Sequence, residues 1–268
     1  MKPRPFDYLR PESVTEAVDA LARYGDDARV LAGGQTLVAM LNLRLIETAA
    51  LIDISQLKEL DRIRVSGNML EVGAAVTQNR LLAWPGLRTH APLLAEMLPW
   101  VGHFQTRNRG TVCGSIAHAD PSSELPLALA MLDGEVVLQS KRGTRTLKAA
   151  EFQIGMLTTA REPDELIVAA RFSIEKGRAA FREIARRHGD FAIVSVAAWS
   201  KGKNRMRIGI GGAHNRPFVR DVDRNVTRDD VESLVWELEP YEDMHASPRM
   251  RRDLVRNLAP GIIAEARA

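Results

Sequence analysis

The chain contains a single cysteine, Cys113, among its 268 residues. One cysteine excludes an intramolecular disulfide, and it excludes an iron–sulfur cluster whose ligands are all cysteines of this chain. No apolar run approaches the roughly 18 residues of a membrane-spanning helix. The segment from Met1 to Phe6 lacks the apolar core of a secretory signal. These absences favour a soluble protein of the cytoplasm.

Strong charge and metal-binding patterns are also absent. The formal net charge is only +3, and the arginine clusters at 186–187 and 249–252 are not accompanied by a nucleic-acid-binding motif. Solvated helix faces explain these clusters better than an anionic partner does. None of the six histidines has the spacing of a metal ligand, and His118, between two alanines, is expected to be a packed, hydrogen-bonded residue. The sequence shows neither a Ser-His-Asp order nor a catalytic carboxylate pair, so it predicts no catalytic residue and no metal site.

The first fifty-odd residues have the pattern of a compact α/β unit. Ser13 and Glu16 form a capping signal for a helix that Gly25 is expected to end. The following elements are a short buried strand at 29–32, an apolar-faced helix at 37–45 and a buried strand at 51–54.

From residue 63 the pattern changes to an α+β arrangement. The expected strands lie at 63–65, 69–72, 135–138, 144–147, 165–170, within 191–199 and at 206–210, the last two joined by a turn at 201–204. We expect a short helix that begins at Thr77 and two further helices at 92–100 and 124–132. Two more helices are expected near the end of the sequence, the last of them capped by Ser247. We therefore predict a domain at 1–176, with lobes of about 1–57 and 58–176, and a smaller domain at 177–268.

Two turns rich in small residues, at 31–37 (LAGGQTL) and 107–121 (RNRGTVCGSIAHADP), carry the strongest functional signal. Such turns leave backbone N–H groups unshielded, and two of them that converge can bind a pyrophosphate. Glycine also permits positive φ and a close approach of the ligand to the backbone. Taken alone, the Gly33-Gly34 pair is more typical of an ordinary strand-to-helix turn.

Together and in this order, the two turns resemble the phosphate loops of the flavin-binding medium subunit of molybdenum hydroxylases, the carbon monoxide dehydrogenase and xanthine dehydrogenase family. The stretch from Arg107 to Pro121, followed by Glu124, matches the signature of that family almost without a break. The resemblance extends from residues 5–8 to about 211–213. It implies an oxidoreductase subunit with a two-lobed FAD-binding domain of the PCMH type and a small α+β C-terminal domain.

The resemblance implies FAD as the cofactor and a set of residues that bind it. The residues expected to hold the diphosphate are Ala32, Gly33, Gly34, Gln35, Thr36 and Leu37 of the first loop and Thr111, Val112, Cys113, Gly114 and Ser115 of the second. Asp120 and Glu124 would accept hydrogen bonds from ribityl or ribose hydroxyls. A turn of the C-terminal domain would be fixed by Asp190 and would place Phe191 against the flavin ring. The alternatives are that the two carboxylates complement a helix N-terminus and that Phe191 belongs to the core.

The resemblance also implies a complex. A large subunit would hold a molybdenum–pterin cofactor and a small subunit would hold [2Fe–2S] clusters, and the resemblance implies that two such heterotrimers form a dimer. FAD would pass electrons from the clusters to an external acceptor such as NAD, a quinone or oxygen. The sequence identifies neither the substrate nor the acceptor.

Cys113 departs from the family pattern, because the family usually has glycine at this position. A cysteine with positive φ would be strained by about 1–2 kcal/mol, and its side chain would crowd the phosphates. A thiol beside a pyrophosphate should also resist ionisation. Either this position tolerates cysteine with negative φ, or the chain is a flavin-free structural or assembly subunit of the same fold.

Overall fold

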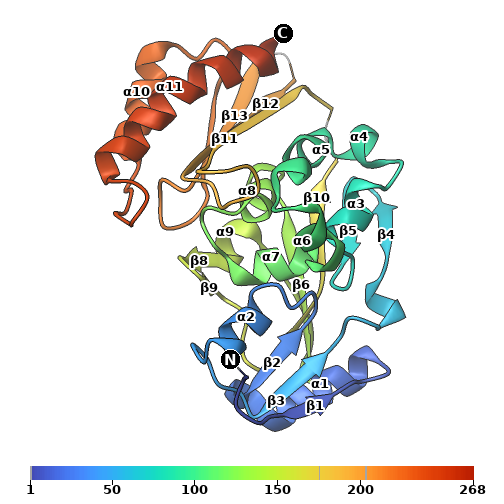
Figure 1. Ribbon diagram of the computed structural model, residues 1–268. Helices are drawn as coiled ribbons and strands as arrows, with labels where there is room; N and C mark the ends of the chain where they lie inside the picture. The colour runs from blue at the N-terminus through green and yellow to red at the C-terminus, as the bar shows by residue number, and fades with distance from the viewer. Residues whose placement is uncertain (1, 175, 203) are drawn as a thin grey trace.

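The computed structural model describes residues 2–174, 176–202 and 204–268. Residue 175, beside the predicted domain boundary, and residue 203, in the predicted turn at 201–204, lie outside them. Figure 1 shows three units in succession along the molecule: a small N-terminal sheet, a central sheet surrounded by short helices, and a C-terminal sheet with two helices on one face. No helix among the described residues is both long and apolar enough to cross a membrane.

The N-terminal unit is a three-stranded parallel sheet in the order β1-β3-β2. Its elements are β1 (Asp7–Leu9), α1 (Val14–Tyr24), β2 (Ala28–Leu31), α2 (Leu37–Asn42) and β3 (Ala50–Asp53). The predicted cap is confirmed, since the Ser13 hydroxyl accepts a hydrogen bond from the Glu16 N–H and Gly25 ends α1 with a φ of 53°. Helix α2 is shorter than predicted, because Arg44 adopts a left-handed φ of 58° that a helix cannot continue through.

The central unit is a five-stranded antiparallel sheet in the order β4-β5-β10-β6-β7. Its strands are β4 (Ile63–Ser66), β5 (Met69–Gly73), β6 (Glu135–Ser140), β7 (Gly143–Lys148) and β10 (Leu166–Ser173). The helices are α3 (Gln78–Leu82), α4 (Leu87–His90), α5 (Pro92–Met97), α6 (Phe104–Arg109), α7 (Val112–His118), α8 (Glu124–Met131) and α9 (Ala149–Phe152), and β8 (Gln153–Gly155) pairs with β9 (Thr158–Thr159). The predicted helix at 92–100 ends early in a 3₁₀ turn at Leu98–Trp100, where Pro99 has no N–H to continue the α-helical ladder.

The C-terminal unit is an antiparallel meander of four strands: β11 (Ala179–Ile184), β12 (Val194–Lys201), β13 (Arg205–Gly211) and β14 (Phe218–Asp223). Helices α10 (Arg228–Glu237) and α11 (Pro248–Arg267) complete it, and α11 packs on β11 and β12. The opposite face contributes Phe181, Ala197 and Trp199 to the core of the central unit. This shared core fixes the C-terminal sheet against the central unit, next to α8.

Candidate functional site

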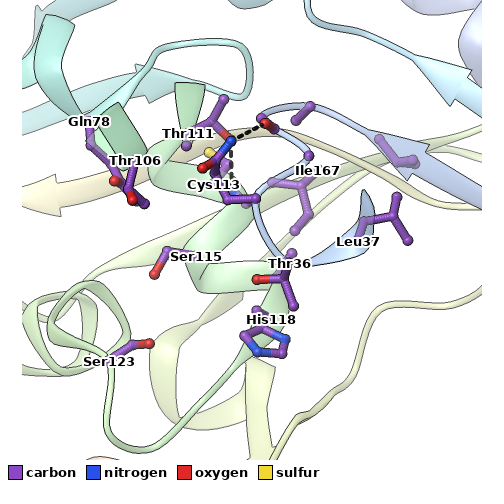
Figure 2. Close-up of a pocket in the computed structure, with 18 of the residues that line it drawn as sticks. Thr36, Leu37, Gln78, Thr106, Thr111, Cys113, Ser115, His118, Ser123 and Ile167 are labelled. Atoms are coloured by element: carbon purple, nitrogen blue, oxygen red, sulfur yellow. Dashed lines mark hydrogen bonds between the residues drawn. The ribbon is translucent and has the colours of Figure 1, made fainter. Parts of the chain in front are cut away.

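A cleft of about 640 Å³ lies where the N-terminal, central and C-terminal units meet. The predicted residues that line it are Ala32, Gly33, Gly34, Gln35, Thr36, Leu37, Thr111, Cys113, Gly114, Ser115, Glu124, Asp190 and Phe191. Figure 2 shows Thr36 of the first loop next to the helix that carries Ser115 and His118 of the second, with Leu37 farther from it. The two loops, far apart in the sequence, therefore form opposing walls of one cleft.

The two loops touch at Gly33. A Cβ atom at this position would lie 2.7 Å from the Cα of Gly110 and closer still to the carbonyl oxygen of Arg109. Gly34 has a φ of 70°, which glycine adopts at little cost. The first glycine is thus required by the approach of the second loop, and the second glycine by the turn itself.

The first loop presents a run of free backbone donors. Among the described residues, the N–H groups of residues 33–37 donate to no protein acceptor, whereas the next one, of Val38, donates to the Gly34 carbonyl at 3.0 Å. The side-chain amide of Gln35 donates to the Gly33 carbonyl at 3.1 Å and so braces the turn. Consecutive free N–H groups at a glycine turn fit an anionic ligand such as a diphosphate.

Much of the predicted second loop is helical, in α6 and α7, and the turn between these helices is held by hydrogen bonds on both sides of Thr111. The Thr111 hydroxyl accepts from the Gly114 N–H at 3.0 Å and caps α7. The N–H of Gln78 donates to the Gly110 carbonyl at 2.8 Å, and that of Val112 donates to the Val76 carbonyl at 3.1 Å. These contacts correct the prediction for Val112: its side chain is fully buried in the core and its N–H is already used, so it does not line the cleft.

The Cys113 thiol lies in the core rather than among the phosphate-binding groups. Its side chain is 3% exposed, and its Sγ donates to the Val72 carbonyl at 3.6 Å. Cys113 is not one of the residues with positive φ, so cysteine is not strained here. Burial raises the pKa of the thiol to about 12. The geometry therefore removes the feature of the sequence that had favoured a flavin-free subunit.

The two carboxylates predicted near the second loop occupy different places. Asp120 accepts a hydrogen bond from the Ser122 N–H at 2.8 Å and lines an adjoining cavity of about 530 Å³ instead of the main cleft. Its predicted contact with ribityl or ribose hydroxyls therefore stays a prediction, made from a cavity that shares Asp190 and Phe191 with the main cleft. Glu124, the first residue of α8, does line the cleft, and burial, reinforced by the negative charge of Asp120, raises its pKa to about 7. Near neutral pH its carboxyl group can thus donate as well as accept a hydrogen bond.

The C-terminal unit contributes the turn at residues 187–191. Arg187 and Asp190 form an ion pair with an N–O distance of 3.1 Å, and Gly189 packs so tightly on His103 that a Cβ would lie 2.6 Å from its ring. Phe191 is 58% exposed and lines both cavities. The alternative that Phe191 is a core residue is therefore wrong, and its ring is free to contact a ligand.

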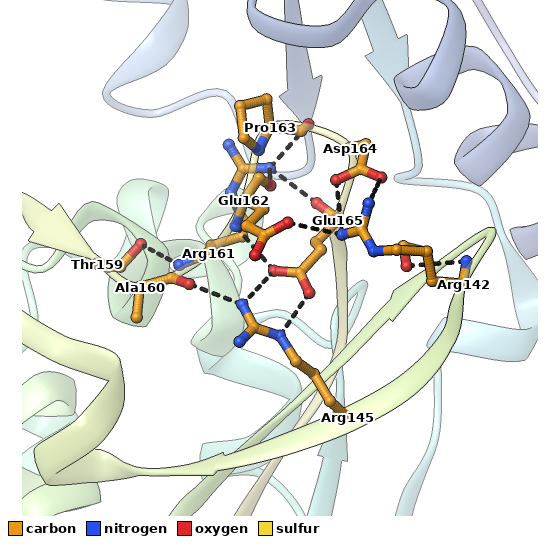
Figure 3. A network of polar contacts seen from close by, with 10 residues as sticks. Arg142, Arg145, Thr159, Ala160, Arg161, Glu162, Pro163, Asp164 and Glu165 are labelled. Atoms are coloured by element: carbon orange, nitrogen blue, oxygen red, sulfur yellow. Dashed lines mark hydrogen bonds and ion pairs between the residues drawn. The ribbon is translucent and has the colours of Figure 1, made fainter.

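Several cleft residues were not predicted. At one end, Arg161 Nη1 donates to the carbonyls of Glu162, Pro163 and Glu165 at 2.8–3.2 Å, and Arg145 fixes the Glu165 carboxylate (Figure 3). Burial, followed by the positive charge of Arg29, lowers the pKa of Arg161. The sequence feature that could have indicated this part of the cleft wall is the charge-rich segment 161–165, just before a buried strand.

The other unpredicted lining residues include apolar side chains, such as Met40 and Ile167, and polar side chains of the central unit. Gln78 and Thr106 lie beside the second loop in Figure 2, and Ser123 lies near the start of α8. His118, expected to be packed, is instead half-buried on the cleft wall at the end of α7. Gln78, Thr106 and Ser123 lie outside both predicted glycine turns, so the sequence pattern offered no reason to select them, whereas His118 lies within the second turn.

Comparison with known proteins agrees with this geometry. Residues 4–172 match the model of the family described as the FAD binding domain in molybdopterin dehydrogenase. The 6-hydroxypseudooxynicotine dehydrogenase complex subunit alpha of Paenarthrobacter nicotinovorans is 35% identical over 99% of this chain and 96% of its own length. The carbon monoxide dehydrogenase medium chain of Hydrogenophaga pseudoflava is 37% identical over 74% of this chain and 69% of its own.

The solved structures give the same result for the fold. A chain of quinoline 2-oxidoreductase from Pseudomonas putida 86 superposes with a TM-score of 0.93 at 33% identity, covering 100% of this chain and 98% of that one. The cleft residues fit the implied cofactor, since free N–H groups and a close glycine contact meet where a dinucleotide needs its diphosphate bound. The chain belongs to the family of FAD binding domains in molybdopterin dehydrogenases, as the FAD-binding medium subunit of a molybdenum-containing oxidoreductase.

Proposed function

We propose that this subunit takes electrons from [2Fe–2S] clusters of a small partner subunit and passes them through FAD to an external acceptor. Substrate would be oxidised at a molybdenum–pterin cofactor in a large partner subunit, and two such heterotrimers would associate. The names of the relatives support a complex, since they include a complex subunit alpha and medium chains. The unpaired, buried thiol of Cys113 is compatible with the proposed cytoplasmic location.

The observation that carries the proposal is the contact between the two glycine loops, with five consecutive free N–H groups in the first. We place the diphosphate between these loops, bound by the residues of both that line the cleft. The flavin ring then extends toward Glu124, Asp190 and Phe191, and the adenosine toward Arg161. FAD supplies the redox chemistry, because it accepts and releases one or two electrons. The chain itself binds and orients the ring and shields one of its faces with Phe191.

The first experiment uses the purified full chain. FAD is added in excess, free FAD is removed by gel filtration, and the near-ultraviolet and visible absorbance is recorded. Retained flavin absorbance is expected from the loop geometry. A colourless chain that remains colourless when co-purified with its partner subunits would instead favour a structural or assembly role.

The second experiment tests the electron route in the assembled complex. Carbon monoxide, aldehydes and N-heterocyclic aromatic compounds are mixed anaerobically with the complex and, separately, with the FAD-loaded chain alone. One of these compounds is expected to bleach the flavin in the complex but not in the isolated chain. Bleaching of the isolated chain would show that it oxidises substrate by itself and would contradict the proposed route.

A further inference from the structure

Gln78 connects the start of α3 to the second glycine loop. Its backbone N–H donates to the Gly110 carbonyl at 2.8 Å, and a Cβ at Gly110 would lie 3.1 Å from the side-chain oxygen of Gln78. The side chain is 5% exposed overall and lines the cleft. Gln78 is therefore packed against the loop that caps α7, with its amide at the cleft wall.

The amide of Gln78 has no hydrogen-bond partner among the described residues. Its Oε1 is fully buried and unpaired, and its Nε2 donates to nothing. Gln153 provides a comparison within the same chain, since it is 3% exposed but its Nε2 donates to the Pro126 carbonyl at 3.1 Å. An unpaired buried amide destabilises a fold, so one that persists at a binding cleft points to a partner outside the protein.

The surroundings of Gln78 show which part of the cleft it serves. In Figure 2, Gln78 and Thr106 lie on the opposite side of the second loop from Leu37 and Ile167. Thr106 adjoins Gly102, since a Cβ at Gly102 would lie 3.1 Å from the Thr106 methyl group. A Cβ at Gly189 would lie 3.1 Å from the carbonyl carbon of Gly102. This wall thus continues from Gln78 to the turn that carries Phe191.

We propose that the Gln78 side-chain amide hydrogen bonds to the ribityl–isoalloxazine half of FAD, with the Thr106 hydroxyl beside it. The inference rests on the proposed function, in which the flavin ring points toward Phe191. Because Oε1 is buried against the second loop, the amide would contact the cofactor through Nε2, which can donate to the ribityl hydroxyls or to an acceptor at the polar edge of the ring. Gln78 would thus supply a polar contact to the flavin half in addition to the one that the sequence assigned to Asp120.

The test compares Gln78→Leu with Gln153→Leu in the full chain, using FAD and ADP as titrants in calorimetry. ADP shares the diphosphate and adenosine but lacks the flavin half. Gln78→Leu is expected to weaken FAD binding between about 2- and 13-fold, the range for one hydrogen bond between neutral groups, and to leave ADP binding unchanged. Its cofactor-free melting temperature should stay level or rise, because an unpaired polar group is removed. Gln153→Leu should show the reverse, with a lower melting temperature and unchanged FAD affinity.

Gln78→Met, of similar length, repeats the test with a second apolar side chain. Wild-type FAD affinity in both Gln78 variants would overturn the inference and leave the proposed function intact. An equal loss of ADP and FAD affinity would also overturn it, since Gln78 would then act only through the shape of the second loop. If the wild-type chain binds no FAD even in its complex, the proposed function and the inference both fail.

Discussion

The closest contact between the glycine loops predicts a large effect for the smallest substitution, Gly33→Ala. The added methyl group would lie 2.7 Å from the Cα of Gly110, whereas ordinary van der Waals contact begins at 3.4 Å. It would lie closer still to the carbonyl oxygen of Arg109. Both obstacles are backbone atoms, so a rotamer change cannot relieve the overlap. The loops must therefore separate by about 0.7 Å or more, a distance that matters because packing forces change steeply over fractions of an ångström.

The free-energy cost of Gly33→Ala can appear either in the stability of the fold or in the affinity for FAD. Overpacking of this kind typically costs about 1–3 kcal/mol. If the two loops move apart in the cofactor-free chain, folding is not destabilised. The same free energy is then lost from FAD binding, because the diphosphate must contact both loops at once. FAD affinity should then fall by about 5- to 150-fold. If the loops cannot part, the same cost lowers the melting temperature by roughly 2–12 °C.

The assay is FAD titration by calorimetry, with thermal unfolding of the same samples. Gly261→Ala is the matched control, because a Cβ at this position in α11 meets no atom within 4 Å. It should leave FAD affinity unchanged and stabilise the helix by up to about 1 kcal/mol. A Gly33→Ala variant with wild-type affinity and wild-type melting temperature would refute the reasoning that the two loops form one rigid phosphate site.

The glycine loops were predictable because their signal is local. Gly33 and Gly34 stand between a buried strand and a helix, and the required backbone geometry is encoded within a few residues. The capping role of Thr111 is equally local, since its hydroxyl accepts from the N–H three residues later. The resemblance to a known family joined the two loops, which no spacing rule could have done.

The sequence did not show which of the two carboxylates, Asp120 or Glu124, lines the main cleft. Only three residues separate them in the sequence, and either carboxylate could serve a ligand or a helix N-terminus. Ala119, with a left-handed φ of 52°, reverses the chain direction just before Asp120, whose carboxylate then braces the turn that leads into α8. A small residue with positive φ leaves no mark in the sequence, so the choice between the two acids required the structure.

The other walls of the cleft depend on tertiary contacts. Gln78 reaches the second loop because Thr77 pairs with Thr111 as an isolated β-bridge, a contact between segments with no shared motif. Arg161 lines the cleft from the segment that leads into β10, the central strand of its sheet. Such residues can be identified only from their position in the folded chain, whereas glycine loops can be identified from the local amino-acid composition.

Three further predictions follow from the geometry. Gly114→Asp should abolish FAD retention in gel filtration, because a carboxylate would occupy the proposed phosphate site, and a variant with stoichiometric FAD would defeat that assignment. The Cys113 thiol should not react with a thiol reagent at about pH 8 until the chain is unfolded, since its thiolate is scarce and shielded; rapid labelling of the native chain would contradict its core position. Glu183 on β11 has both carboxyl oxygens buried, with no hydrogen-bond partner among the residues that the structure describes. Burial, reinforced by the negative charge of Glu124, raises its pKa from an ordinary 4.5 to about 8. A raised pKa in the folded state means that the neutral acid supports folding below the ordinary value, and that this stability is lost as the pH rises through about 8. Glu183→Gln keeps the shape of the neutral acid but does not titrate. The melting temperature of this variant should therefore fall less than that of the wild type between about pH 5 and about pH 9. Parallel curves for the two proteins would show that Glu183 does not carry a proton into the folded state.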